Sequence, residues 1–171
     1  MMPLKHRYAA LLFMSGAAWL GNASALGVGD VAPNIALPTA TPAATVDLAK
    51  LKGKIVYVDF WASWCGPCKL SFPWMNDMHT KFAARGLEIV AINVDARMPD
   101  AQRFLATMPA KFTVAFDAKG QTPKQFDVKA MPTSYLLDGD GKVVYVHAGF
   151  RDADRAALEA AIENALTQRK K

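Results

Sequence analysis

The chain has 171 residues, of which 52% are hydrophobic and 20% are charged. This composition excludes a disordered chain and a coiled coil, and it supplies enough apolar material for one domain with its own core. Two cysteines are too few for a small scaffold held together by several disulfides. The net charge is +5, but beyond the first 25 residues the only basic cluster is the terminal 169–171 segment. We therefore expect no nucleic-acid surface.

The first 25 residues have the layout of a secretory signal peptide. Residues 5–7 are basic, residues 8–20 form an apolar run, and residues 23–25 form a small-x-small cleavage site. The run is shorter than the roughly 20 apolar residues that span a membrane. We predict cleavage after Ala25, with an uncleaved anchor as the alternative. The mature domain, residues 26–171, would carry a charge of +3, because two of the five net positive charges leave with the peptide. We expect it to be periplasmic, with no transmembrane segment.

Hydrophobic patterning predicts a small hairpin followed by alternating strands and helices. The hairpin would join residues 34–38 to residues 45–48. The later strands are predicted at 55–60, 87–94, 112–116, 133–137 and 142–147, and the helices at 67–85, 100–107, 121–126 and 152–168. We expect Pro73 to kink the first helix, Gly86 to end it and Asp152 to cap the last one. This order predicts an α/β fold with a mixed, mainly parallel sheet and helices on both faces.

The two cysteines lie between a buried strand and a helix, in the segment Cys65-Gly66-Pro67-Cys68. Free backbone N–H groups at a helix start favour a thiolate, so we predict Cys65 to be the exposed nucleophile. Cys68 would lie one turn inside the helix, shielded, and would resolve the mixed disulfide that Cys65 forms. The pair can close a disulfide across one helical turn. These cysteines are the predicted redox-active disulfide.

Asp59 interrupts an otherwise apolar strand six residues before Cys65. Burial would raise the pKa of this carboxyl and make it a proton acceptor for the resolving thiol. The alternative is an inert, hydrogen-bonded aspartate at the end of a strand. The nearby cysteine pair favours the proton-relay role.

Segment 58–69, Val-Asp-Phe-Trp-Ala-Ser-Trp-Cys-Gly-Pro-Cys-Lys, resembles the active-site segment of thioredoxin. Pro73 matches the helix kink of that family, and Met131-Pro132-Thr133 resembles its cis-proline loop, which faces the disulfide. Gly149 resembles the glycine that shapes the substrate groove. The resemblance implies the thioredoxin fold and a cis bond before Pro132. It also implies that the Met131 backbone pairs with an extended substrate segment.

Within this superfamily, residues 28–168 resemble the secreted TlpA/ResA-like thiol:disulfide reductases. The N-terminal hairpin and a helix–strand insertion between Asp95 and Asp117 fit that group. The resemblance implies a monomer without a cofactor that reduces disulfides of extracytoplasmic proteins, such as apocytochrome c or copper-site proteins. Its electrons would come from a membrane thiol donor.

The sequence departs from the patterns of these families at two positions. Ser71 stands where ResA-like proteins often have a glutamate, and thioredoxin's lysine partner for the buried aspartate is absent from the 90–93 segment.

Other interpretations of these residues stay open. The Gly66-Pro67 dipeptide favours a reductase, but a disulfide oxidase or isomerase is an alternative. The cysteine pair with Met131 could instead bind copper(I) as a chaperone, since soft sulfur ligands suit that ion. The two mature histidines lack zinc-ligand spacing, so we predict no metal site of that kind, and His147 is interpreted as an ordinary strand residue. The expected substrate surface consists of Trp64, Gly66, Pro67, Met131, Pro132 and Gly149, with Trp61 and Trp74 as further candidates for an apolar rim.

Overall fold

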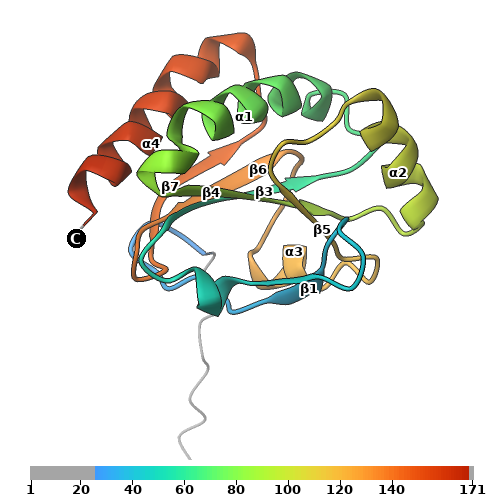
Figure 1. Ribbon diagram of the computed structural model, residues 1–171, viewed down its shortest axis with the longest axis horizontal. Coiled ribbons are helices and arrows are strands. Elements are labelled where there is room, and N and C mark those ends of the chain that lie inside the picture. The colour runs from blue at the N-terminus through green and yellow to red at the C-terminus, as the bar shows by residue number, and fades with distance from the viewer. Residues whose placement is uncertain (1–25, 170–171) are drawn as a thin grey trace, which may run out of the picture.

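The computed structural model describes residues 26–169 (Figure 1). The predicted signal peptide, residues 1–25, lies outside the described residues. A five-stranded sheet in the order β5-β4-β3-β6-β7 forms the centre of the domain. Its strands are β3 (Ile55–Trp61), β4 (Leu87–Asn93), β5 (Thr113–Phe116), β6 (Thr133–Leu137) and β7 (Val143–Ala148). The predicted hairpin is confirmed as the antiparallel pair β1 (Ala36–Pro38) and β2 (Thr45–Asp47).

The sheet is divided evenly between parallel and antiparallel pairs. Strand β4 lies parallel to both β3 and β5, whereas β6 is antiparallel to both β3 and β7. The prediction of a mixed sheet is confirmed, but "mainly parallel" is wrong, because the β6–β7 hairpin packs beside β3 and supplies the antiparallel half. The predicted helix–strand insertion is present as α2 (Met98–Thr107) and β5.

Helices cover both faces of the sheet, as predicted (Figure 1). One face carries α1 (Cys68–Phe82), α2 and α4 (Arg155–Gln168), and the other carries α3 (Thr122–Gln125) and the hairpin. Two predicted helix ends are wrong. The last turn before Gly86 is a separate 3₁₀ turn, and Asp152 starts a 3₁₀ turn ahead of α4 instead of capping that helix. Gly86 itself ends the first helical segment with a φ of 100°, as expected.

Strand β3 is buried along its whole length and separates two apolar clusters. Ile55, Tyr57 and Trp61 belong to the cluster beneath α1, α2 and α4, whereas alternate residues belong to the cluster on the α3 side. Trp61 packs against Phe104 of α2, with ring centroids 4.8 Å apart, so the insertion is part of the main core. The two-residue period places Asp59 on the same face as Tyr57 and Trp61, beneath α1, α2 and α4. Across residues 26–169, no helix combines the length and apolar character needed to cross a bilayer.

Candidate active site

Cys65 and Cys68 form a disulfide, with their Cα atoms 5.3 Å apart. Cys65 lies in the loop after β3, and Cys68 is the first residue of α1, so the prediction that Cys68 lies one turn inside the helix is wrong. Cys65 is 4% exposed and Cys68 fully buried. In the disulfide form Cys65 is therefore less exposed than predicted, because its sulfur is turned toward the start of the helix.

The backbone N–H of Cys68 donates a hydrogen bond to the Sγ atom of Cys65 over 3.3 Å. Pro67, which precedes it, has helical backbone angles and contributes no N–H. When the disulfide is reduced, the same N–H and the positive end of the helix dipole lie beside the Cys65 sulfur. Both stabilise a thiolate at that position.

The loop before Cys65 is fixed to the neighbouring strand by a buried carboxylate. Asp95 accepts hydrogen bonds from the Ser63 backbone N–H over 2.9 Å and from the Ser63 hydroxyl over 3.0 Å. It also accepts one from the Asn93 amide over 2.8 Å. The sequence analysis missed this network. A signal was available, since Asn93-Val94-Asp95 ends a strand parallel to β3, and parallel strands end at the same edge of a sheet.

Asp59 is 1% exposed and accepts a 2.7 Å hydrogen bond from the Ser134 hydroxyl through Oδ1. Its Oδ2 atom is buried and has no hydrogen-bond partner. Loss of hydration raises the pKa of Asp59 to about 7, although the hydrogen bond from Ser134 acts in the opposite direction. The raised pKa predicted from the sequence is confirmed. Its register partners are Ala91 and Ser134, so no lysine lies opposite it on either neighbouring strand.

The bond between Met131 and Pro132 is cis, as the resemblance to thioredoxin implies. The Pro132 carbonyl accepts a 2.7 Å hydrogen bond from the backbone N–H of Gly149, which has a φ of +83°. Only glycine adopts this left-handed conformation without strain. The hydrogen bond therefore joins the cis-proline loop to the end of β7.

A hollow of about 440 Å³ brings Cys65 together with four of the predicted substrate-binding residues. It is lined by Trp64, Cys65, Gly66, Pro67, Met131 and the segment 128–130. Trp64 is 70% exposed, in agreement with its predicted place on the surface. Trp61 and Trp74 are buried, so the prediction that they belong to an exposed rim is wrong. They pack on the core side of the sheet and α1, where each contacts an aromatic neighbour.

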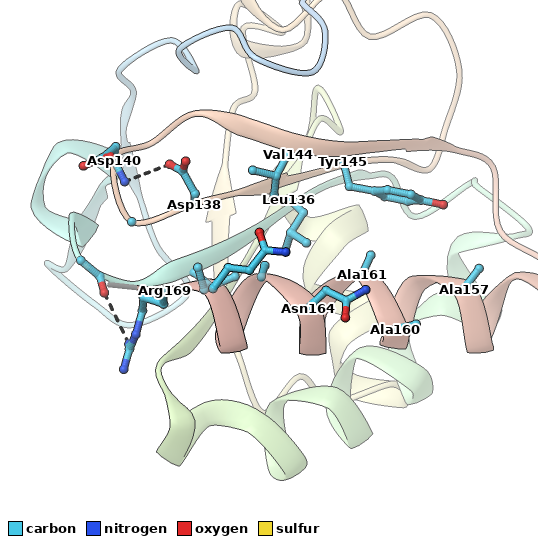
Figure 2. Close-up of a pocket in the computed structure, with 15 residues that line it drawn as sticks. Leu136, Asp138, Asp140, Val144, Tyr145, Ala157, Ala160, Ala161, Asn164 and Arg169 are labelled. Carbon is cyan, nitrogen blue, oxygen red and sulfur yellow. Dashed lines mark hydrogen bonds between the residues drawn. The ribbon is translucent and has the colours of Figure 1, made fainter. Parts of the chain in front are cut away.

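A second hollow, of about 580 Å³, lies between α4 and the β6–β7 hairpin (Figure 2). Small side chains of α4, including Ala157, Ala160 and Ala161, form one wall, and none of the predicted site residues lines this hollow.

Among the described residues, no group of three or more His, Cys, Asp or Glu side chains is arranged to hold a metal ion. Ser71, which stands where ResA-like proteins often have a glutamate, is buried, and its hydroxyl donates a hydrogen bond to the Cys68 carbonyl over 3.1 Å. A serine hydroxyl cannot replace the carboxyl group of that glutamate as an acid.

The sheet has the strand order of the thioredoxin fold, a Cys-Gly-Pro-Cys disulfide lies at a helix start, and a cis-proline loop lies beside it. These features define the class of thioredoxin-fold proteins that catalyse thiol:disulfide exchange. Residues 27–162 match the family model Redoxin, and the chain belongs to this family. It is 34% identical to the thiol-disulfide oxidoreductase ResA of Bacillus cereus over 82% of this chain and 85% of that protein. It is 38% identical to ResA of Bacillus subtilis, over 71% of this chain and 67% of that protein.

One solved structure extends this agreement to the fold. A protein from Chlorobium tepidum, assigned as the thiol:disulfide interchange protein DsbE, shares 56% identity and a TM-score of 0.81 with this chain. The match covers 83% of this chain and 99% of the other. The resemblance to TlpA/ResA-like proteins is thus confirmed, and the chain is a thiol:disulfide oxidoreductase that works through its Cys-x-x-Cys pair.

Proposed function

We propose that the chain is a periplasmic reductase of protein disulfides. The observation that carries the proposal is the Cys65–Cys68 disulfide at the start of α1. This helix packs over the face of the sheet that holds the buried Asp59 carboxyl, whose pKa is about 7. The location rests on the signal-peptide pattern of residues 1–25, with cleavage after Ala25. Substrates would be disulfide-containing extracytoplasmic proteins, and a membrane thiol donor would return the chain to its dithiol form.

The cysteines divide the reaction into two exchanges. The Cys65 thiolate attacks one sulfur of a partner disulfide, which forms a mixed disulfide and releases the other partner sulfur as a thiolate. Cys68 then gives its proton to Asp59, and its thiolate attacks Cys65 Sγ. The second partner sulfur leaves, and the chain ends in the disulfide form seen here. Two electrons pass from the chain to the partner. A carboxyl with a pKa near neutrality suits this proton transfer, because it can both accept and release the proton.

The hollow beside Cys65 gives the substrate a place to bind. We assign the backbone of Met131 to pairing with an extended substrate segment, with Pro132 and Gly149 holding that backbone in position. Trp64 supplies exposed apolar contact area, and Gly66 and Pro67 line the same hollow. Copper(I) binding is a second candidate, because Cys65 and Met131, two soft sulfur ligands, line the same hollow.

A trapping experiment tests the reductase proposal. The Cys68→Ala variant, produced in the periplasm, should accumulate mixed disulfides through Cys65, and mass spectrometry of these adducts would identify the partners. The matched control is the double variant Cys65→Ala/Cys68→Ala, which should trap nothing. The proposal also predicts a reduction potential near that of thioredoxin, roughly −270 mV.

Two results would overturn the proposal. A potential near that of the strong oxidant DsbA, roughly −120 mV, would indicate an oxidase. An absence of adducts, together with tight copper(I) binding by the reduced protein that is lost in Met131→Ala, would favour the chaperone.

A further inference from the structure

A row of polar side chains crosses the sheet from buried Asp59 toward the molecular surface. Ser134 lies opposite Asp59 on β6, and His147 lies opposite Ser134 on β7. Side chains at such paired positions project to the same face, with Cβ atoms roughly 4.5–5.5 Å apart. The hydrogen bond from Ser134 to Asp59 shows that the first pair is in contact.

The next pair along β6 and β7 identifies the face. Leu136 lies opposite Tyr145, and both line the hollow beneath α4, as Figure 2 shows. Ser134 and His147 are each two residues from this pair, so they project to the same side of the sheet. Tyr145 stacks on the imidazole of His147, with ring planes 13° apart, and this contact orients the ring.

The outer end of the row reaches the start of α4. His147 Nε2 lies 3.3 Å from Asp154 Oδ2, and their side chains are 18% and 12% exposed. Asp154 is also paired with Arg151, whose side chain is 80% exposed. The row therefore runs from Asp59, which is 1% exposed, past the partly buried side chains of His147 and Asp154 to the exposed side chain of Arg151.

We propose that Ser134 and His147 form the route by which the proton taken up by Asp59 reaches solvent. The proposal rests on the proposed function, in which Cys68 gives that proton to Asp59. The carboxylic acid of Asp59 passes its proton to Ser134 Oγ while the Ser134 hydroxyl proton passes, through one bridging water, to an imidazole nitrogen of His147. His147, whose side chain is 18% exposed, then releases a proton to water. One proton leaves the protein in each cycle, and no other bond changes.

The chemistry of the row suits this task. A hydroxyl both donates and accepts, so Ser134 can relay a proton without becoming charged in its resting state. An imidazole ring can accept a proton on one nitrogen and release a proton from the other. A single bridging water can close the remaining gap between Ser134 and His147. The titratable or charged groups that surround the row are Tyr57 and Asp59 on β3, Tyr145 on β7, and Arg151, Asp154 and Arg155 at the start of α4.

Ser134 and His147 act through Asp59, so they are positioning residues, and their test requires a kinetic readout. The measurement is the rate at which Cys68 resolves a preformed mixed disulfide, followed by stopped flow across the pH range at low buffer concentration. We expect His147→Gln to slow this step several-fold and added imidazole to restore the rate. Ser134→Ala should slow it as well, and Ser134→Thr, which keeps the hydroxyl, should not.

His79→Gln is the matched control, because His79 lies on α1, outside the row, and its loss should leave the rate unchanged. Thermal unfolding of each variant shows that it is folded. Normal resolution rates in both His147→Gln and Ser134→Ala would overturn the inference and place proton release at the opening beside Cys65. Slow rates in His147→Gln that imidazole does not restore would also overturn it. A failure of the proposed function is distinguishable, because then Asp59→Asn would resolve at the normal rate as well.

Discussion

At the scale of single residues, the burial of Asp59 makes the stability of the fold depend on pH. Its pKa rises from 3.8 to about 7 when the chain folds, so the native protein binds this proton more tightly than the unfolded chain does. The free energy of unfolding therefore falls as the pH rises from about 4 to about 7, and it levels off above that range. A pKa difference of about three corresponds to roughly 4 kcal/mol. The protein keeps a costly group in its core, as expected where an acid serves the chemistry.

We predict opposite effects of Asp59→Asn on stability and on reaction rate. At a pH of about 8 the oxidised variant should be more stable than the wild type, by up to about 4 kcal/mol, because position 59 no longer holds a carboxylate that must be ionised in the core. The difference should disappear at a pH of about 4, where the native wild-type carboxyl is protonated. The resolving attack by Cys68 should become slower at neutral pH. Guanidinium unfolding at both pH values and stopped-flow exchange would measure these effects.

Asp95→Asn is the matched control for this variant. Asp95 is also a buried carboxylate, but it accepts three hydrogen bonds, so its replacement should destabilise the protein at both pH values. If Asp59→Asn were destabilising at pH 8, or resolved mixed disulfides at the wild-type rate, Asp59 would be a structural residue rather than the proton acceptor.

At the scale of elements, every predicted strand and helix exists, because hydrophobic periodicity and turn residues are local properties. The errors and omissions fall where particular side-chain contacts decide, and several of these contacts join residues far apart in the sequence. The start of α1 depends on Pro67 and on the Cys65 sulfur, which takes the first free N–H. The register that places Ser134 beside Asp59 joins residues 75 positions apart. The burial of Trp74 depends on contacts with Tyr57 and Phe150 from other elements. A single sequence shows none of these pairings.

The loop between β3 and α1 provides a prediction at this scale. Ser63→Ala removes one hydrogen bond to Asp95 and leaves the backbone N–H bond in place, so it should cost about 1 kcal/mol of stability. Asp95→Asn loses the charged acceptor of all three bonds and should cost more, about 2–3 kcal/mol. Denaturant unfolding of the two variants beside the wild type would measure the difference. Equal and negligible losses would show that the network does not fix this loop.

At the scale of the whole molecule, the first described residues, which follow the predicted cleavage site, pack onto the domain. Leu26 packs against the apolar cluster on the α3 side of the sheet. The segment that follows runs antiparallel to the start of β7, where Gly29 N–H donates to the Val143 carbonyl over 2.8 Å and Ala32 N–H to the Gly141 carbonyl over 2.9 Å. Val143 N–H in turn donates to the Asp30 carbonyl over 2.9 Å. A chain that starts at Leu26 therefore keeps the contacts of this segment.

We predict that the exported protein consists of residues 26–171. Its intact mass, measured after release from the periplasm, should match cleavage after Ala25, because residues 23–25 supply the small side chains that the cleavage site requires. A chain produced without the first 25 residues should have the same unfolding midpoint and exchange activity as the exported protein. A chain that starts at Pro33 should be less stable, because it loses the hydrogen bonds to β7. Recovery of the full-length mass in the membrane fraction would show instead that the N-terminal segment is an uncleaved anchor.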